Sequence, residues 1–328
     1  MPNMDFSTEN KVCIRTHYNK QVIKFLKEEY GYFMVYFGLP APEAYDIECW
    51  IEYLDYIIAF QCRNWRSPSH PDQSREAVDQ LTEKLSNYEV RKQIKNYVVY
   101  DGYIEEVIFR GYDNSYKGQP FIYDKYVTVF NLDFCNKISS PQFYTDINGT
   151  QIRKYKVELI DKILDLQYGT AQEGAKFVLF VTFNADYNGE ELSNFINGNA
   201  NLIEHYSSLP IKKRKRKILR LYIENIIFQT IKSNGFIPQF LPTIEYRGIG
   251  DTPMFQFAVL CVKPTLMPDH APIFYQSVEE VVNRKAIKPN SEHNGFEMVT
   301  YRNIEENNVN LDFLEDLIDS ENFNNHWR

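Results

Sequence analysis

The segment 127–136 (VTVFNLDFCN) holds the residues best suited to chemistry, because an apolar run ends there in Asn131, Asp133 and Asn136. In a β-strand, Asn131 and Asp133 share one face, since side chains alternate with a period of two. A neighbouring amide and carboxylate can hydrogen-bond a ligand or accept its proton. A buried carboxylate also needs a partner or a ligand. The alternative is that both residues only cap the following turn, where Asn and Asp are common.

Three other apolar runs end in glycine or polar residues. The carboxyl ends of parallel strands meet at one edge of a sheet, where α/β proteins bind ligands, so we expect these residues near Asp133. They are Gly38, Leu39, Pro40, Glu43, Gln61, Asp101 and Gly102. Asp101 could contact a cofactor, or a metal together with Glu105 and Glu106. The alternative is that these acids only cap a helix and fill its first turn.

Apolar runs with the length of buried strands alternate with helical patterns along the chain. The expected strands are 32–37, 56–60, 97–100, 127–132 and 176–183, and the expected helices are 21–30, 42–54, 74–85, 103–110, 154–166 and 212–233. Two further runs, 236–246 and 255–262, have only a short Gly-rich connector between them, which predicts a hairpin. The order predicts an α/β, Rossmann-like three-layer sandwich with a mostly parallel seven-stranded sheet that ends in an antiparallel hairpin.

The same pattern divides the chain into three parts. We expect an N-terminal helical extension over 1–30, the sheet domain over 31–263, and a C-terminal extension over 264–328. Residues 1–11 are polar and are expected to fray. The C-terminal part carries an acidic amphipathic segment at 311–318 (LDFLEDLI), which could dock in the groove of a partner protein.

This order of elements resembles the class I S-adenosylmethionine-dependent methyltransferase superfamily, whose seven-stranded sheet also ends in a hairpin. The resemblance covers roughly 30–263 and implies S-adenosylmethionine as cofactor. The turn 38–43 would then approach the methionine part of the cofactor, Gln61 would meet the ribose, and Asp101 the adenine amine. Relative to that pattern, the turn at 38–43 is poor in glycine, and Gln61 stands where an acid is usual.

The resemblance also assigns roles at the end of the 127–132 strand. Asn131, Asp133 and Phe134 would be the catalytic residues, because Asn131-Leu132-Asp133-Phe134 stands where methyltransferases orient the acceptor atom. The segment is similar to the Asn/Asp-Pro-Pro-aromatic motif of amino-methyltransferases, without its prolines. The implied activity is methyl transfer to a nucleic-acid base or another amine. An amine in a base would have to be flipped into the site.

Composition limits the partners. The net charge is −8, so nucleic acid would have to meet a local basic patch such as Lys212–Lys217 (KKRKRK). That run could equally be the exposed first turns of a helix. His205 follows the fifth strand and could act as a base or simply be exposed. Scattered cysteines without a CxxC pair, the absence of a signal-like N-terminus and the lack of a roughly 20-residue apolar stretch favour a cytoplasmic protein without metal or membrane contact.

Two alternatives remain open. The sparse glycines at 38–43 and the amide of Gln61 favour a catalytically degenerate Rossmann-like scaffold or sensor subunit of a larger assembly. A metal-dependent nuclease would use Asp101, Glu105 and Asp133. This second alternative is weaker, because no lysine-bearing nuclease motif lies near these acids.

Overall fold

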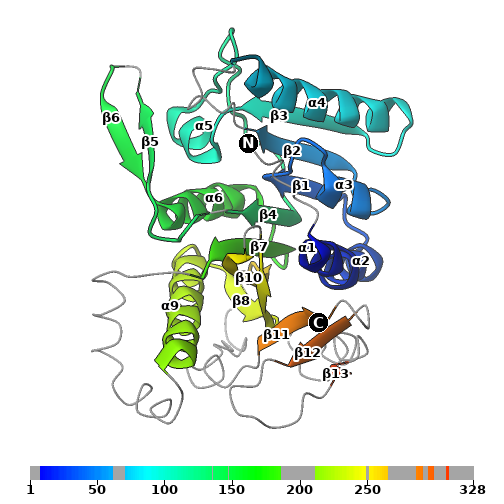
Figure 1. The fold of residues 1–328 in the computed structure, drawn as a ribbon. Helices are drawn as coiled ribbons and strands as arrows, with labels where there is room; N and C mark the ends of the chain where they lie inside the picture. The colour runs from blue at the N-terminus through cyan, green and yellow to red at the C-terminus, as the bar shows by residue number, and fades with distance from the viewer. Residues whose placement is uncertain are drawn as a thin grey trace.

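A computed structural model describes residues 8–61, 71–134, 136–146, 148–185, 211–248, 251–264, 286–290, 295–298 and 308–309. Its main sheet has the order β13-β12-β11-β9-β10-β7-β4-β1-β2-β3, with β8 beside β10 (Figure 1). The strands are β1 (Val35–Gly38), β2 (Tyr56–Gln61), β3 (Asn96–Asp101), β4 (Val129–Asp133), β7 (Lys176–Asn184), β8 (Ile237–Phe240), β9 (Thr243–Arg247), β10 (Pro253–Val262), β11 (Ala286–Asn290), β12 (Gly295–Met298) and β13 (Asn308–Val309).

The five strands β3, β2, β1, β4 and β7 are parallel, and β10 runs antiparallel between β7 and β9. The expected mostly parallel sheet that ends in an antiparallel hairpin is thus confirmed. The run 236–246 is divided, because β8 and β9 are separated by Leu241 and Pro242, and both pair with β10. The sheet is also larger than expected, since β11 to β13 extend it beyond β9.

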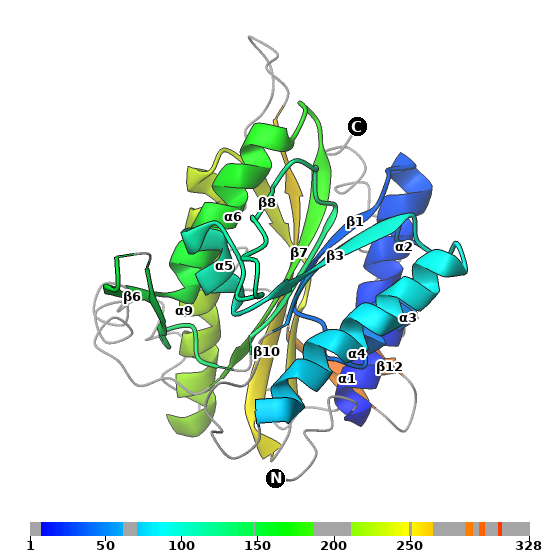
Figure 2. The ribbon, with the colours of Figure 1, turned by 90° about the horizontal axis from the view of Figure 1, so that it is seen from above.

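Helices cover both faces of this sheet, which makes the three layers seen edge-on in Figure 2. The helices α5, α6 and α9 pack on one face around Phe37 and Phe130, and the N-terminal helices with α3 and α4 pack on the other around Tyr36 and Trp50. The alternation of Tyr36 and Phe37 in β1 follows from the two-residue period of a strand. The bounds are α1 (Glu9–Cys13), η1 (Ile14–Asn19), α2 (Lys20–Tyr30), α3 (Tyr45–Trp50), α4 (Pro71–Val90), α5 (Ile104–Arg110), α6 (Lys156–Thr170) and α9 (Ile211–Ser233).

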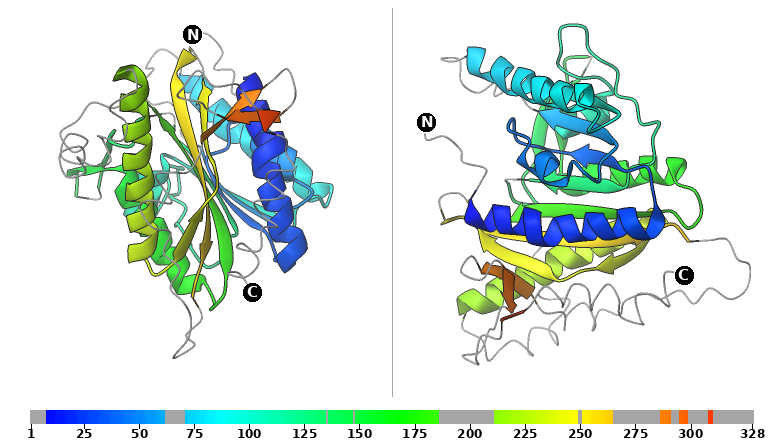
Figure 3. Two further views of the ribbon diagram at one scale, coloured as in Figure 1. Left: turned by 90° about the horizontal axis from the view of Figure 1, so that it is seen from below. Right: turned by 90° about the vertical axis from the view of Figure 1, so that its right-hand side faces the viewer.

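The N-terminal helix is longer than the sequence predicts. It begins at Glu9, where the Thr8 side chain accepts from the Lys11 main-chain nitrogen, passes through the π-helical turn η1, and ends at Gly31 in the left-handed conformation. The expected fraying up to residue 11 is therefore wrong for residues 9–11. Figure 3 shows this helix lying along the sheet.

Buried hydrogen bonds fix this helix to late parts of the chain. The Tyr18 hydroxyl donates to the Pro242 carbonyl at 2.7 Å, and the Gln256 amide donates to Asn19 Oδ1 at 2.5 Å. Tyr18 is completely buried. The helix is therefore part of the layer that covers the sheet.

A second, two-stranded sheet was not predicted. The strands β5 (Gln142–Thr145) and β6 (Gln151–Lys154) form an antiparallel hairpin between β4 and α6. It projects from the body of the molecule beside α5 and α6 (Figure 1). Each strand has only four residues, too few for the alternation of apolar and polar residues to stand out in the sequence.

Candidate functional site

A pocket of about 250 Å³ lies at the carboxyl ends of β1, β2, β3 and β4. This is the edge where the polar strand ends were expected to meet. Six of the ten predicted site residues line it, together with Arg15, Asp46, Glu105, Gln142 and Lys156. The six are Leu39, Pro40, Gln61, Gly102, Asp133 and Phe134. The other four, Gly38, Glu43, Asp101 and Asn131, are not among its lining residues.

Asp133 is paired with a residue of the N-terminal helix. The Lys11 ammonium lies 2.6 Å from Asp133 Oδ2, and the exposed fractions of the two side chains are 9% and 19%. The other oxygen, Oδ1, is buried and accepts no hydrogen bond from the part of the chain that the structure describes. A buried carboxyl oxygen without a donor is costly, so Oδ1 retains an acceptor that a ligand group could satisfy.

Asn131 belongs to a second buried network. Its amide donates to Asp46 Oδ2 at 2.8 Å and to the Tyr36 hydroxyl at 3.3 Å, and Asp46 also forms an ion pair with Arg15. Burial, followed by the charge of Asp46, raises the pKa of Tyr36 well above its usual value. Asn131 is 5% exposed and faces this network, so its immediate role is to hold Asp46 in place beside the pocket.

A third ion pair joins Lys156, at the start of α6, to Glu105 of α5. Both side chains are buried, and the Lys156 ammonium also lies 5.2 Å from the centre of the Phe134 ring. Phe134 in turn stacks on Phe183 with ring centres 5.5 Å apart. Phe134 therefore forms an aromatic wall of the pocket, with a cation on one side.

The three ion pairs mean that each acid lining the pocket already faces a cation of this chain. Sequence reasoning found Asp133 and named Glu105, but missed Lys11, Arg15, Asp46 and Lys156. Lys11 and Arg15 lie one helical turn apart on the same face, which is the only signal that could have linked them. Nothing local indicates partners at such separations, since Lys11 and Asp133 are 122 residues apart.

Gly38 is required by packing against the neighbouring strand. A Cβ atom built there would lie 2.3 Å from the Asn131 carbonyl oxygen. Leu39 donates from its main-chain nitrogen to the same oxygen at 3.0 Å. The close approach at Gly38 thus joins β1 to β4 and turns Leu39 and Pro40 toward the pocket.

The end of β3 makes a tight turn. Gly102 has φ +146°, and a Cβ atom there would lie 3.0 Å from the Asn114 side chain. Asp101 is buried, and its main-chain nitrogen donates to Asp113 Oδ2 at 3.1 Å. Gly102 and Gln61 are joined by a hydrogen bond from the Gly102 nitrogen to the Gln61 carbonyl at 3.0 Å. These contacts fix the β2 and β3 ends side by side.

Within the described ranges, no group of three or more His, Cys, Asp or Glu side chains is placed to hold a metal ion. Two acids of the nuclease alternative, Glu105 and Asp133, each pair with a lysine. In the same part of the chain, no helix is long and apolar enough for a bilayer. His205 and segment 311–318 lie outside the described residues.

The basic run Lys212–Lys217 begins α9, as the helical interpretation predicts. Lys215 is exposed, whereas Arg214, Arg216 and Lys217 are half-buried. Burial, followed by the charge of Arg220, lowers the pKa of Lys217 to about 8. The last cation of the run is thus partly neutral at mildly alkaline pH.

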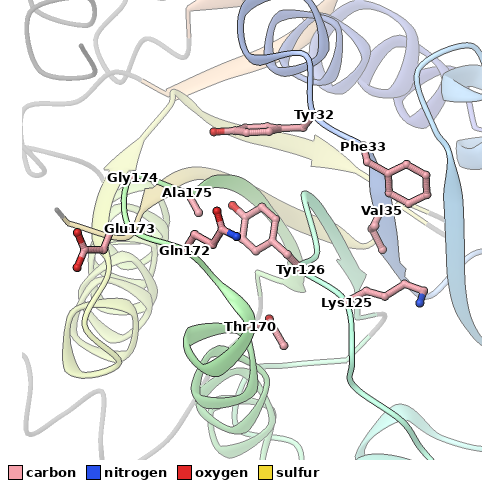
Figure 4. Close-up of a pocket in the computed structure, with 10 residues that line it drawn as sticks. All are labelled: Tyr32, Phe33, Val35, Lys125, Tyr126, Thr170, Gln172, Glu173, Gly174 and Ala175. Carbon is pink, nitrogen blue, oxygen red and sulfur yellow. The ribbon is translucent and has the colours of Figure 1, made fainter.

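A larger cavity of about 580 Å³ lies at the opposite edge of the sheet, at the amino ends of β1, β4 and β7 (Figure 4). Its walls are mostly apolar and include Tyr32, Phe33 and Tyr126. None of the predicted site residues lines it. Because ligands of open α/β sheets bind at the carboxyl edge, the smaller pocket remains the candidate site.

The chain is distantly similar to several solved structures. No family model matches the sequence, and no curated protein does. Among solved structures, the chain is similar to a S-adenosylmethionine-dependent methyltransferase from Agrobacterium tumefaciens (TM-score 0.37, 11% identity, covering 76% of this chain and 62% of that one).

Two other solved structures match to a similar degree. One is TYW2 from P. horikoshii in complex with MeSAdo (TM-score 0.38, 12% identity, covering 80% of this chain and 66% of that one). The other is an arsenic(III) S-adenosylmethionine methyltransferase from Chlamydomonas reinhardtii (TM-score 0.35, 10% identity, covering 73% of this chain and 66% of that one). The chain spans less than two thirds of all three matched structures. These identities and TM-scores are too low to carry an argument about this chain, so the fold class rests on the strand order given above.

Proposed function

We propose that this chain is a methyltransferase-like protein that binds S-adenosylmethionine at the carboxyl edge of its sheet. One observation supports this most directly. Residues from four separate strand ends, which the resemblance assigned to cofactor and acceptor, line one pocket: Leu39 and Pro40, Gln61, Gly102, and Asp133 with Phe134. Such convergence at the carboxyl edge is typical of ligand sites in open α/β sheets.

The residues that line the pocket fit S-adenosylmethionine, a nucleoside that carries a charged amino-acid group, only in part. Leu39, Phe60 and Ile104 give apolar walls for a base, and the Gln61 amide can hydrogen-bond a ribose hydroxyl, without the strength of a carboxylate. Gly38 offers no free cradle, because the Asn131 carbonyl fills the space beside it. At about 250 Å³ the pocket is also smaller than the roughly 300 Å³ at which drug-sized ligand sites begin.

When bound, the cofactor would supply a methyl group on a positively charged sulfur. The residues of this chain would bind the cofactor and orient the methyl acceptor. Asp133 Oδ1 could accept a hydrogen bond or a proton from an acceptor amine, and Phe134 could stack on the acceptor if it is a nucleic-acid base. Correct orientation is itself a large part of such catalysis.

Calorimetric titration with S-adenosylmethionine and with S-adenosylhomocysteine tests the proposal. We expect micromolar binding of at least one ligand, which Leu39→Trp abolishes by filling the pocket. Thr170→Trp, which places the same bulk in the cavity at the amino edge, is the matched control and should bind normally. Absence of binding at millimolar ligand would remove the proposal.

A scaffold or sensor subunit is the second candidate. The observation in its favour is that Asp133 and Asn131 are already engaged within the chain, by Lys11 and Asp46. A scaffold would bind neither ligand and would co-purify with a fixed partner. Loss of that partner on deletion of 305–328 would support docking through the acidic tail, whereas an unchanged complex would exclude it.

A further inference from the structure

The hairpin β5–β6 is a preformed projection. The Asp146 carboxylate accepts from the main-chain nitrogens of Asn148 and Thr150 at 2.9 and 2.8 Å, and Asp146 and Thr150 also pair through the main chain at 3.0 Å. Gly149 takes the positive φ of +79° that the turn needs. A turn held in this way keeps the two strands in one register, so the outer face is fixed before any partner binds.

One face of the hairpin packs against the body. Tyr144 is 9% exposed, and the Lys154 ammonium lies 4.6 Å from the centre of the Phe109 ring in α5. Lys154 also forms an ion pair with Glu158 at 2.9 Å. An isolated two-stranded hairpin is marginally stable, so these contacts explain why it stays ordered.

The other face is free in the described structure. Phe143 is 48% exposed and lies directly opposite Arg153, which is also exposed. Directly opposed residues of an antiparallel pair share one face, so the outer face carries both an aromatic ring and a guanidinium. The Arg153 guanidinium also lies 5.2 Å from the centre of the Tyr155 ring. The segment 137–154 holds three cations, Lys137, Arg153 and Lys154, and one anion, Asp146, in a chain of net charge −8.

The hairpin is also continuous with the candidate site. It is inserted between Phe134 and Lys156, both of which line the carboxyl-edge pocket, and its first residue, Gln142, lines the pocket too. The base of the hairpin therefore borders the pocket.

We propose that β5–β6 binds single-stranded nucleic acid, with a base stacked on Phe143 and a phosphate held by Arg153. An exposed ring next to a cation suits this ligand, because unstacked bases stack on aromatic side chains while arginine contacts the backbone. A duplex keeps its bases stacked on one another and offers Phe143 no free face. The inference rests on the proposed function only in that the pocket would receive a base of the bound strand.

Fluorescence anisotropy with a labelled 12-nucleotide single-stranded RNA of mixed sequence tests the inference on the full chain. Phe143→Ala should weaken binding at least about fivefold, the low end of what base stacking contributes. Arg153→Ala should weaken binding and reduce the salt dependence by about one phosphate contact. Tyr116→Ala and Arg91→Ala, an exposed ring and an exposed cation elsewhere, should leave affinity unchanged.

Three results would overturn the inference: no binding of the RNA at low salt, equal affinity of Phe143→Ala and wild type, or equal affinity for the matching duplex. Binding of poly-glutamate that depends on Arg153 and competes with the RNA would assign the face to acidic peptides instead. The cofactor titration, repeated on Phe143→Ala, separates the two proposals. RNA binding without cofactor binding would defeat only the proposed function, and cofactor binding without RNA binding would defeat only this inference.

Discussion

Gly38 shows how one residue serves both the sheet and the pocket. Its missing side chain lets β1 approach the Asn131 carbonyl, and that approach sets where Leu39 and Pro40 turn toward the pocket. The sequence predicted a close approach at Gly38 and attributed it to a ligand. The atom that needs the space belongs to the protein, and no pattern in the sequence distinguishes the two.

Gly38→Ala should therefore destabilise the fold. The new methyl would lie 2.3 Å from a main-chain oxygen that cannot move without disturbing β4. Overpacking of this kind costs about 1–3 kcal/mol. Gly169→Ala is the control, because no atom lies within 4 Å of its Cβ position and α6 should gain about 0.5–1 kcal/mol. Urea unfolding of both variants measures the difference, and equal midpoints would contradict the packing role.

The candidate site was predictable only where local pattern fixes geometry. The strand period placed Asn131 and Asp133 on one face of the strand, and the rule for parallel strand ends placed Asp133, Gln61 and Gly102 at one edge of the sheet. The partners of the acids could not be found, because the Lys11–Asp133 ion pair and the Asn131–Asp46 hydrogen bond join residues 122 and 85 positions apart. Pairing over such separations is decided by tertiary packing, and the periodicity of the sequence carries no information about it.

At the scale of elements, the N-terminal helix is the main departure from expectation. It lies on the sheet face beside α3 and sends Lys11 and Arg15 toward the pocket edge. Buried Val22, Ile23 and Leu26 gave a helical signal, whereas the polar composition before them hid the two turns that reach the site. The sequence predicts fraying for these polar residues because their partners, such as Asp133 for Lys11, are far away in the sequence.

Deletion of residues 1–19 should therefore cost much of the stability. It removes the cations that face buried Asp46 and half-buried Asp133, and losing one partner of a buried ion pair costs about 3–5 kcal/mol. We expect a large drop in the urea midpoint, measured by circular dichroism. Deletion of residues 1–7 alone should leave the midpoint unchanged. A 1–19 deletion that unfolds at the wild-type midpoint would show that the helix is dispensable.

At the scale of the whole molecule, the order of strands follows from the sequence more readily than their number. Long apolar runs flanked by helices predicted the parallel strands, and the helix-free connector predicted the antiparallel pair. The short strands β5, β6 and β11 to β13 were not predicted, because a strand of two to five residues shows too little periodicity to recognise.

The layered core predicts where hydrogen exchange is slowest. Eight of the nine residues of β7 are buried, as are eight of the ten of β10, and β7 lies between β4 and β10. Exchange there should require global unfolding, whereas β3, at the sheet edge, should exchange through local opening. Hydrogen exchange followed by mass spectrometry checks this. Protection of β3 equal to that of β7 would show that the sheet opens only as one unit.

The position of β10 also has a consequence for synthesis of the chain. β10 is made after β9 but lies between β7 and β9, so the backbone groups along that edge of β7 are not fully paired until residue 262 has been added. Asn19, for its part, meets Gln256 across 237 residues. At about 5–20 residues per second, a ribosome needs tens of seconds to span that distance. The first helix and β7 are thus synthesised well before β10, the strand that completes their contacts.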